Sequence, residues 1–398
     1  MRSSKVISKV LPSFLFNDSL LVLEIADGMV AGTLVRVDPV RKQATIAGSA
    51  SQKVTDGNFG EAVKSVSKKF WRFFPRRAVV LADARQTVTV EGVVSHARRA
   101  PMEEISEQEL ETVVSDGVWK LFDRERAGVA VILRSTNETL SITGAHVLDI
   151  RVDGHRVVDP IGFTGETLDV RYRITYADKE FVRAVRSAIE PYECEGIEES
   201  GSLLARLVQE SGEGEDFLVA SILPASTAVV RRSDELLSYI DACDWGSDSF
   251  ARVIAEAFAV DTQTAERMLA HRYTGTASAG MLKKLDALLI PELATVVRAC
   301  ALQATGAPRQ PVYIYSPKTL PAMLFVSRFA RGFGLAGQVI HFNQQFISEN
   351  FDFQLLYKEE TAGHIAPTLL LAVVAYCYAC TGGSALNKMA NRRARWFS

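Results

Sequence analysis

The chain repeats one order of expected elements, three strands and then a helix, and this repetition limits the folds open to it. The strand-like stretches of the first copy, rich in β-branched residues, are 20–24, 30–37 and 43–49. A helix is expected next over 58–74, because its apolar residues fall on one face. The second copy begins near Asp216 and leads into a helix over 248–260. This duplication predicts two similar α/β lobes that face each other across a cleft.

Composition excludes several classes of function. The 398 residues suffice for two or three domains, and a net charge of −2 gives no global field that would attract nucleic acid. Five scattered cysteines, an odd number, favour a reducing compartment. The six histidines show no i, i+4 pair, and we find no P-loop or G-x-S-x-G motif. We therefore expect no metal site and no nucleic-acid partner.

A separate strand–helix–strand–strand module is expected between the two copies. Its helix begins with a capping box, in which Ser106 is the N-cap and Glu109 lies three residues on. After the module comes "VVDPIGFTGETLDVRYRITYAD", which contains Asp159-Pro160-Ile161-Gly162 and Thr164-Gly165. This stretch resembles the segment that closes the inserted subdomain of the bacterial actin-like division protein FtsA. The stretches "EEISEQELETVV", "LVLEIADGMVAG" and "IAEAFAVDTQTAERML" resemble the same family.

The resemblance implies an α/β, two-lobed actin-like (ribonuclease-H-like) fold with an inserted subdomain in the first lobe. The expected parts are a lead-in at 1–19, a first lobe at 20–85 and 163–212, the inserted subdomain at 86–162, a second lobe at 213–364, a core helix at 365–381 that returns to the first lobe, and an amphipathic tail at 382–398. The pilus-assembly protein PilM shares the two-lobed core and remains an alternative.

The family binds ATP between the lobes through two glycine-bearing turns and an adenosine loop, so the resemblance points to three short stretches. In the first turn, Glu24 is retained as an acid, and Ala26-Asp27-Gly28 replaces the usual glycine and hydroxyl residue. Ala26 adds a Cβ where the backbone must approach the phosphates, and Asp27 adds a negative charge.

The second and third stretches lack more of the residues with which the family binds nucleotide. The second stretch, Ala220–Ala225, contains Ser221 and Pro224 and has neither the acid nor the glycines of the family, and no glycine occurs between Phe217 and Asp244. The third has Ser316-Pro317 in place of a glycine pair. Proline has no N–H to give to a phosphate. We therefore expect a vestigial nucleotide cleft with no catalytic residue, no metal and no cofactor. An active ATPase with diverged loops, using ATP and Mg²⁺, is the alternative.

The tail "GGSALNKMANRRARWFS" has an amphipathic pattern. Its apolar side would carry Leu386, Met389, Trp396 and Phe397, with the stem of Arg393 among them. Its basic side would carry Lys388, Arg392 and Arg395. A basic face opposite Trp and Phe is typical of a helix that lies in a membrane interface. We expect weak, reversible binding to an anionic membrane; the alternative is a basic terminus that only increases solubility.

These features favour a non-catalytic actin-like scaffold that tethers a cell-division assembly to the inner face of the cytoplasmic membrane. The resemblance also implies a homo-oligomer or filament, because the inserted subdomain of the family contacts a neighbouring subunit. The family grips the tail of FtsZ with a strand-bearing subdomain in the second lobe, whereas 274–303 is helical in pattern. FtsZ-tail binding is therefore not expected. A PilM-like role in pilus or secretion assembly is the competing interpretation.

Overall fold

The structure is a computed structural model, and it describes residues 19–38, 40–54, 57–71, 77–211, 216–233, 235–303, 310–318, 320–326, 331–332, 337–351, 354–357 and 385–394. They form two compact units. The first unit takes the described residues of Met1–Leu81, Glu180–Ile197 and Phe351–Ala385, and the second those of Ala82–Lys179, Glu198–Asn350 and Leu386–Ser398. The expected core helix at 365–381, the lead-in up to residue 18 and the tail end at 395–398 lie outside the described residues.

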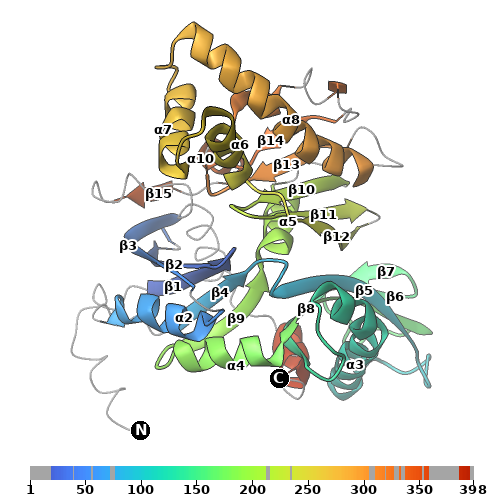
Figure 1. Cartoon of the computed structure of the whole chain (residues 1–398). Helices are drawn as coiled ribbons and strands as arrows, with labels where there is room; N and C mark the ends of the chain where they lie inside the picture. The colour runs from blue at the N-terminus through green and yellow to red at the C-terminus, as the bar shows by residue number, and fades with distance from the viewer. Residues whose placement is uncertain are drawn as a thin grey trace. The chain divides into compact units, whose positions relative to one another are not determined.

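The first unit is built on a six-stranded sheet with the order β15-β3-β2-β1-β4-β9. Its strands are β1 (Ser19–Ala26), β2 (Met29–Asp38), β3 (Gln43–Lys53), β4 (Arg77–Ala82), β9 (Glu193–Glu199) and β15 (Gln354–Tyr357). Helices α2 (Phe59–Lys68) and α4 (Lys179–Ala188) lie side by side along it (Figure 1), and the rings of Phe59 and Phe181 meet edge to face. The three strands and helix predicted for the first copy are therefore present.

The inserted module is a four-stranded antiparallel sheet with a long helix packed on it. The sheet order is β5-β8-β6-β7, and the elements are β5 (Thr87–Ala97), α3 (Glu107–Ile132), β6 (Leu140–Val152), β7 (His155–Val157) and β8 (Thr167–Asp178). At the start of α3, Ser106 Oγ accepts from the N–H of Glu109 at 3.1 Å, as the capping box predicts. The Glu109 carboxylate accepts from the guanidinium of Arg98 at 2.8 and 2.9 Å.

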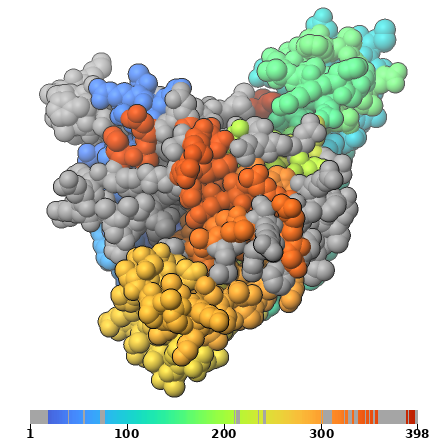
Figure 2. All heavy atoms as spheres, turned by 90° about the horizontal axis from the view of Figure 1, so that it is seen from above, coloured from blue at the N-terminus to red at the C-terminus, as the bar shows by residue number. Residues whose placement is uncertain are grey.

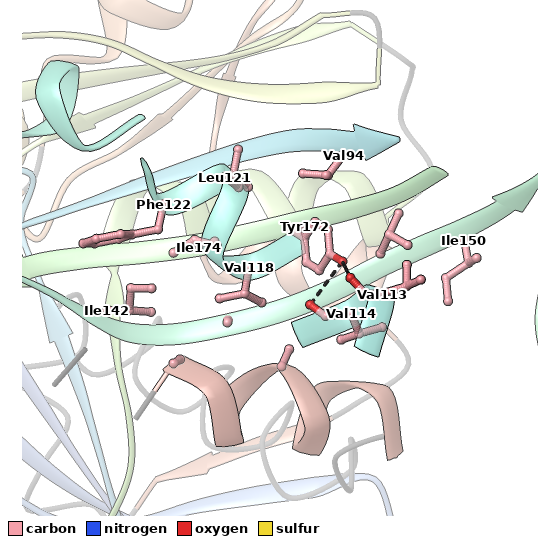
Figure 3. Close-up of a cluster of buried hydrophobic side chains, with 14 of the residues drawn as sticks. Val94, Val113, Val114, Val118, Leu121, Phe122, Ile142, Ile150, Tyr172 and Ile174 are labelled. Atoms are coloured by element: carbon pink, nitrogen blue, oxygen red, sulfur yellow. Dashed lines mark hydrogen bonds between the residues drawn. The ribbon is translucent and has the colours of Figure 1, made fainter. Parts of the chain in front are cut away.

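The core of the module forms around Tyr172 of β8. This side chain is fully buried, and its hydroxyl donates to the carbonyls of Val113 and Val114 in α3, at 3.3 Å each (Figure 3). The rings of Phe122 and Tyr176 stack beside it with centroids 5.8 Å apart. Helix and sheet are thus joined by apolar packing and by one buried hydroxyl.

Two predicted boundaries of the first lobe are corrected. The sequence pattern predicts a return to the first lobe at residue 163, but β8 lies between β5 and β6 in the sheet of the module. The segment up to 212 was also assigned to the first lobe, but α5 (Ser200–Glu210) belongs to the second unit, where a Cβ on Gly201 would lie 3.2 Å from Val230. An alternating pattern identifies a strand without identifying the sheet that it joins.

The second unit also contains a five-stranded sheet with the order β12-β11-β10-β13-β14. Its strands are β10 (Phe217–Ile222), β11 (Thr227–Ser233), β12 (Leu236–Cys243), β13 (Val312–Tyr315) and β14 (Val339–His341). Its other helices are α6 (Asp248–Phe258), α7 (Thr262–Tyr273), α8 (Ala279–Gln303), a 3-10 turn η3 (Ala322–Phe325) and α10 (Gln344–Asn350). Figure 2 shows α7 and the start of α8, in yellow, gathered on one side of this unit.

The core beneath these helices joins α6, α7 and α8 to the sheet. It contains Phe250 and Ile254 of α6, Leu269 of α7 and Leu289 of α8. As the sequence predicts, the described residues between β12 and β13 form helices and connecting loops, with no strand among 244–303 and 310–311. In the part of the chain that the structure describes, no helix is long and apolar enough to cross a membrane.

Candidate functional site

The first expected phosphate turn is a two-residue hairpin in the first unit. Asp27 and Gly28 connect β1 to β2, both have positive φ (47° and 72°), and Ala26 pairs with Met29. This is the turn that Asp-Gly favours between antiparallel strands. Glu24 is buried in β1 opposite Ala31. The Gly28 carbonyl accepts from the N–H of Val54 at 2.7 Å, which fixes the turn against the end of β3.

The second expected phosphate turn binds the beginning of α6. The turn at Leu223–Ser226 is closed by the N–H of Leu223, which donates to the Ser226 carbonyl at 2.8 Å. The Leu223 carbonyl accepts from the N–H of Ser247 at 2.9 Å, and the Pro224 carbonyl accepts from the N–H of Asp248 at 2.8 Å. Two donors at a helix N-terminus, which attract phosphates elsewhere, are therefore used by the turn itself.

Gly246 makes this contact sterically possible. A Cβ at this position would overlap the carbonyl oxygens of both Leu223 and Pro224. Gly246 is not among the residues predicted for the site, although a glycine just before a helix start in "DWGSDS" is a signal for close backbone approach.

The third expected loop supplies a lysine that is paired inside the unit. Ser316 is buried and its Oγ accepts from the N–H of Lys318 at 3.2 Å, with Pro317 between them. Lys318 Nζ lies 2.6 Å from Asp248 Oδ1 and 3.3 Å from Glu266 Oε1. Partial burial lowers the pKa of Lys318, but the hydrogen bonds and negative charges of Asp248 and Glu266 together outweigh burial and hold the pKa above its ordinary value.

The structure thus brings the second and third loops together at the N-terminus of α6. Ser221 in β10 pairs with Tyr315 of β13, immediately before Ser316. Asp248 connects the two loops, because its N–H binds the second and its carboxylate binds Lys318 of the third. Sequence reasoning found both loops but missed Lys318 and Asp248, which are seventy positions apart and carry no shared motif.

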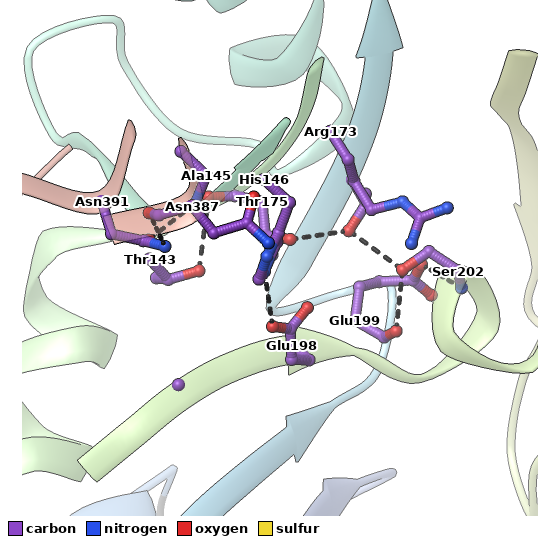
Figure 4. Close-up of polar contacts among 12 residues, drawn as sticks. Thr143, Ala145, His146, Arg173, Thr175, Glu198, Glu199, Ser202, Asn387 and Asn391 are labelled. Atoms are coloured by element: carbon purple, nitrogen blue, oxygen red, sulfur yellow. Dashed lines mark hydrogen bonds and ion pairs between the residues drawn. The ribbon is translucent and has the colours of Figure 1, made fainter. Parts of the chain in front are cut away.

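A buried carboxyl in the same unit was also missed. Glu199 caps α5, accepting from the N–H of Gly201 at 2.7 Å and of Ser202 at 2.6 Å (Figure 4). Burial, with a smaller contribution from the charge of Asp83, raises the pKa of Glu199 to about 7, although the hydrogen bonds from Gly201 and Ser202 act in the opposite direction. Its signal in the sequence is only an acid followed by Ser-Gly-Ser at an expected helix start.

The C-terminal helix α12 (Ala385–Ala394) packs on the inserted module. Leu386 and Met389 lie against the core of the module, and Ala390 and Ala394 are buried in it. This packing differs from the expected free tail, since the apolar face predicted to meet a membrane is covered by protein here. Arg393 is half-buried, and Arg392 pairs with Glu111 of α3 at 2.7 Å. Arg395, Trp396, Phe397 and the side chain of Lys388 lie outside the described part.

Comparison with known proteins identifies the fold. No family model matches the chain, and no curated protein matches its sequence. Among solved structures, the PilM–PilN type IV pilus biogenesis complex aligns with a TM-score of 0.52 and 17% identity, over 90% of this chain and 98% of that one. The chain has a two-lobed actin-like fold.

Two further structures align more distantly. A protein of Bacteroides thetaiotaomicron with an actin-like ATPase fold and unknown function gives a TM-score of 0.41 and 10% identity, over 84% of this chain and 94% of that one. The cytoplasmic domain of EpsL, an inner membrane component of the type II secretion system of Vibrio cholerae, gives 0.36 and 12%, over 92% and 97%. The fold implied by the FtsA resemblance is confirmed, whereas membership of the FtsA family itself stays a prediction.

Proposed function

We propose that the chain is a non-catalytic actin-fold scaffold that holds a protein assembly at the cytoplasmic face of the membrane. One observation carries the non-catalytic part: the N-terminus of α6 is bound by the carbonyls of Leu223 and Pro224, and Lys318 is paired with Asp248. In an ATPase of this fold, donors and cations of this kind have to be available to the phosphates.

Phosphate binding at this place would require these contacts to be exchanged. Each hydrogen bond contributes about 0.5–1.5 kcal/mol net, and the Asp248 carboxylate would repel a phosphate near the helix N-terminus. The Pro224 nitrogen offers no donor in return. We therefore assign the predicted nucleotide-binding residues of these two loops to a structural role, with no cofactor.

The type of assembly has two candidates. The FtsA-like motifs around Asp159 and Thr164 support a cell-division scaffold that self-associates into filaments. The alignment with the PilM–PilN complex over 98% of that chain supports an assembly protein of the pilus or secretion type. Both are membrane-associated assembly roles, in agreement with a basic C-terminal helix and a peripheral location. Isolation of the chain from native membranes, followed by identification of bound proteins, decides between them.

Nucleotide binding tests the non-catalytic assignment. The protein should show no thermal shift with ATP or ADP at millimolar concentration, with or without Mg²⁺. A ligand at 100 times its Kd would add about 2.7 kcal/mol of stability, so a working site would be visible. A Mg²⁺-dependent shift that is lost in Lys318→Met would show that the third loop holds nucleotide, and the active-ATPase alternative would then replace this proposal.

A further inference from the structure

The edge of β6 in the inserted module is covered by side chains of α12. β6 pairs with β8 along its length but with β7 only over Ile150–Val152, so its earlier part is a sheet edge among the described strands. The N–H of Val147 donates to Asn387 Oδ1 at 2.8 Å, and the N–H of Ala145 donates to Asn391 Oδ1 at 3.0 Å (Figure 4). Ala145 and Val147 are two positions apart on one face of the strand, and Asn387 and Asn391 are four positions apart on one face of the helix, so the two pairs lie opposite each other.

A further hydrogen bond within α12 holds one of these asparagine side chains in place. Asn391 Nδ2 donates to the Asn387 carbonyl at 2.9 Å, which fixes the orientation of its amide. An unpaired strand edge is a template for other chains, and native proteins commonly cover it. The two asparagines accept from N–H groups of this edge without a further strand, and both belong to α12.

The remainder of the docking surface is small. Among the side chains of α12 that the structure describes, Ala390 and Ala394 are buried in the module, while the larger Leu386 and Met389 are only partly buried. The ion pair between Arg392 and Glu111 is exposed on both sides, at 71% and 46%, so it contributes little. α12 is therefore attached mainly through two hydrogen-bonded asparagines and a narrow apolar strip.

We propose that α12 is a membrane-binding helix that docks on the β6 edge when it is not bound to a membrane. The β6 edge and an anionic lipid surface compete for it. Both would use the same face, since Leu386 and Met389 contact the module core and are also the described apolar residues of the interfacial pattern. The segment 385–398 carries four basic residues and no acidic one, so an anionic surface attracts it. This inference rests on the proposed membrane role and adds that the role is controlled by a contact within the chain.

A double variant of the full chain tests the competition. Asn387→Ala with Asn391→Ala removes both acceptors but leaves the apolar residues and all four cations in place. It should reach half-binding to phosphatidylglycerol-containing vesicles at several-fold lower lipid concentration than the parent. Amide exchange in peptides covering 140–149 should be faster. Asn137→Ala, an exposed asparagine of the same unit, is the matched control and should behave as the parent.

The outcomes separate this inference from the proposed function. Equal vesicle binding by the parent and by a double variant with faster exchange would overturn the competition and leave the membrane role standing. Unchanged amide exchange at 140–149 in the double variant would show that the two asparagines do not hold α12 on the β6 edge, and this would overturn the inference. Absence of binding by parent and variant alike would overturn the membrane role itself. A measurement without any variant completes the test: vesicles added to the parent should accelerate exchange at 140–149, and phosphatidylcholine vesicles should not.

Discussion

At the scale of single residues, Gly117 shows how tertiary packing reverses a local preference. Gly117→Ala would favour the helix by up to about 1 kcal/mol in an exposed position. Here the new Cβ would overlap the Tyr172 hydroxyl, which the carbonyls of Val113 and Val114 hold in place. We expect a loss of about 1–3 kcal/mol in the free energy of unfolding, measured in urea. Gly128→Ala in the same helix meets nothing within 4 Å and should be neutral or stabilising. Equal effects of both substitutions would contradict this reading.

Glu199 predicts a specific pH dependence of stability. Its pKa in the folded chain is about 7, against an ordinary value of 4.5, so between these values the folded state binds more protons than the unfolded state. Stability should therefore fall as pH rises through this window, by up to about 3 kcal/mol from this group. Glu199→Gln should flatten the dependence between pH 5 and 7 in denaturant unfolding curves. A slope identical to that of the parent would show that the group is ionised throughout.

At the scale of elements, one buried ion pair connects the two sheets of the second unit. Arg173 of β8 lies 2.5 Å from Glu91 Oε1 of β5, and Glu91 Oε2 accepts from the N–H of Leu237 in β12 at 3.0 Å. Glu91→Ala leaves a buried cation without its partner and should cost about 3–5 kcal/mol. Glu91→Leu with Arg173→Met removes both charges and should cost less. If the double variant is less stable than the single one in denaturant, the buried charge is not the cause.

At the scale of the whole molecule, we expect the proposed self-association to use exposed loops of the inserted module. Two loops there are joined by the N–H of Ile105, which donates to the Phe163 carbonyl at 2.8 Å. Met102 and Val158 on these loops are 89% and 99% exposed. We expect sedimentation coefficients that rise with concentration, and Met102→Asp with Val158→Asp to abolish the rise. Val40→Asp, at 94% exposure in the other unit, is the control. Monomers at all concentrations, with and without anionic vesicles, would contradict self-association.

Features that depend on neighbouring residues can be predicted from the amino-acid sequence. Asp27-Gly28 predicts a tight turn because both residues tolerate positive φ, and Ser106 predicts the start of α3 because its hydroxyl reaches an N–H three residues on. The absence of glycine between Phe217 and Asp244 was likewise sufficient to mark an altered second turn. The repeated order of three strands and a helix predicted two similar α/β lobes, and the resemblance to the FtsA family pointed to the actin-like fold.

The surfaces that these elements meet depend on contacts between distant parts of the chain, and they became known from the three-dimensional structure. β8 has the alternation of a strand, but its place between β5 and β6 depends on backbone pairing that no side-chain pattern encodes. The contact of Lys318 with Asp248 joins residues seventy positions apart. The apolar face of α12 predicts that this face is buried. Because the hydrophobic effect is not directional, the pattern does not tell whether a lipid surface or the core of the module buries it. The asparagines that bind the β6 edge decide in favour of the module in this structure.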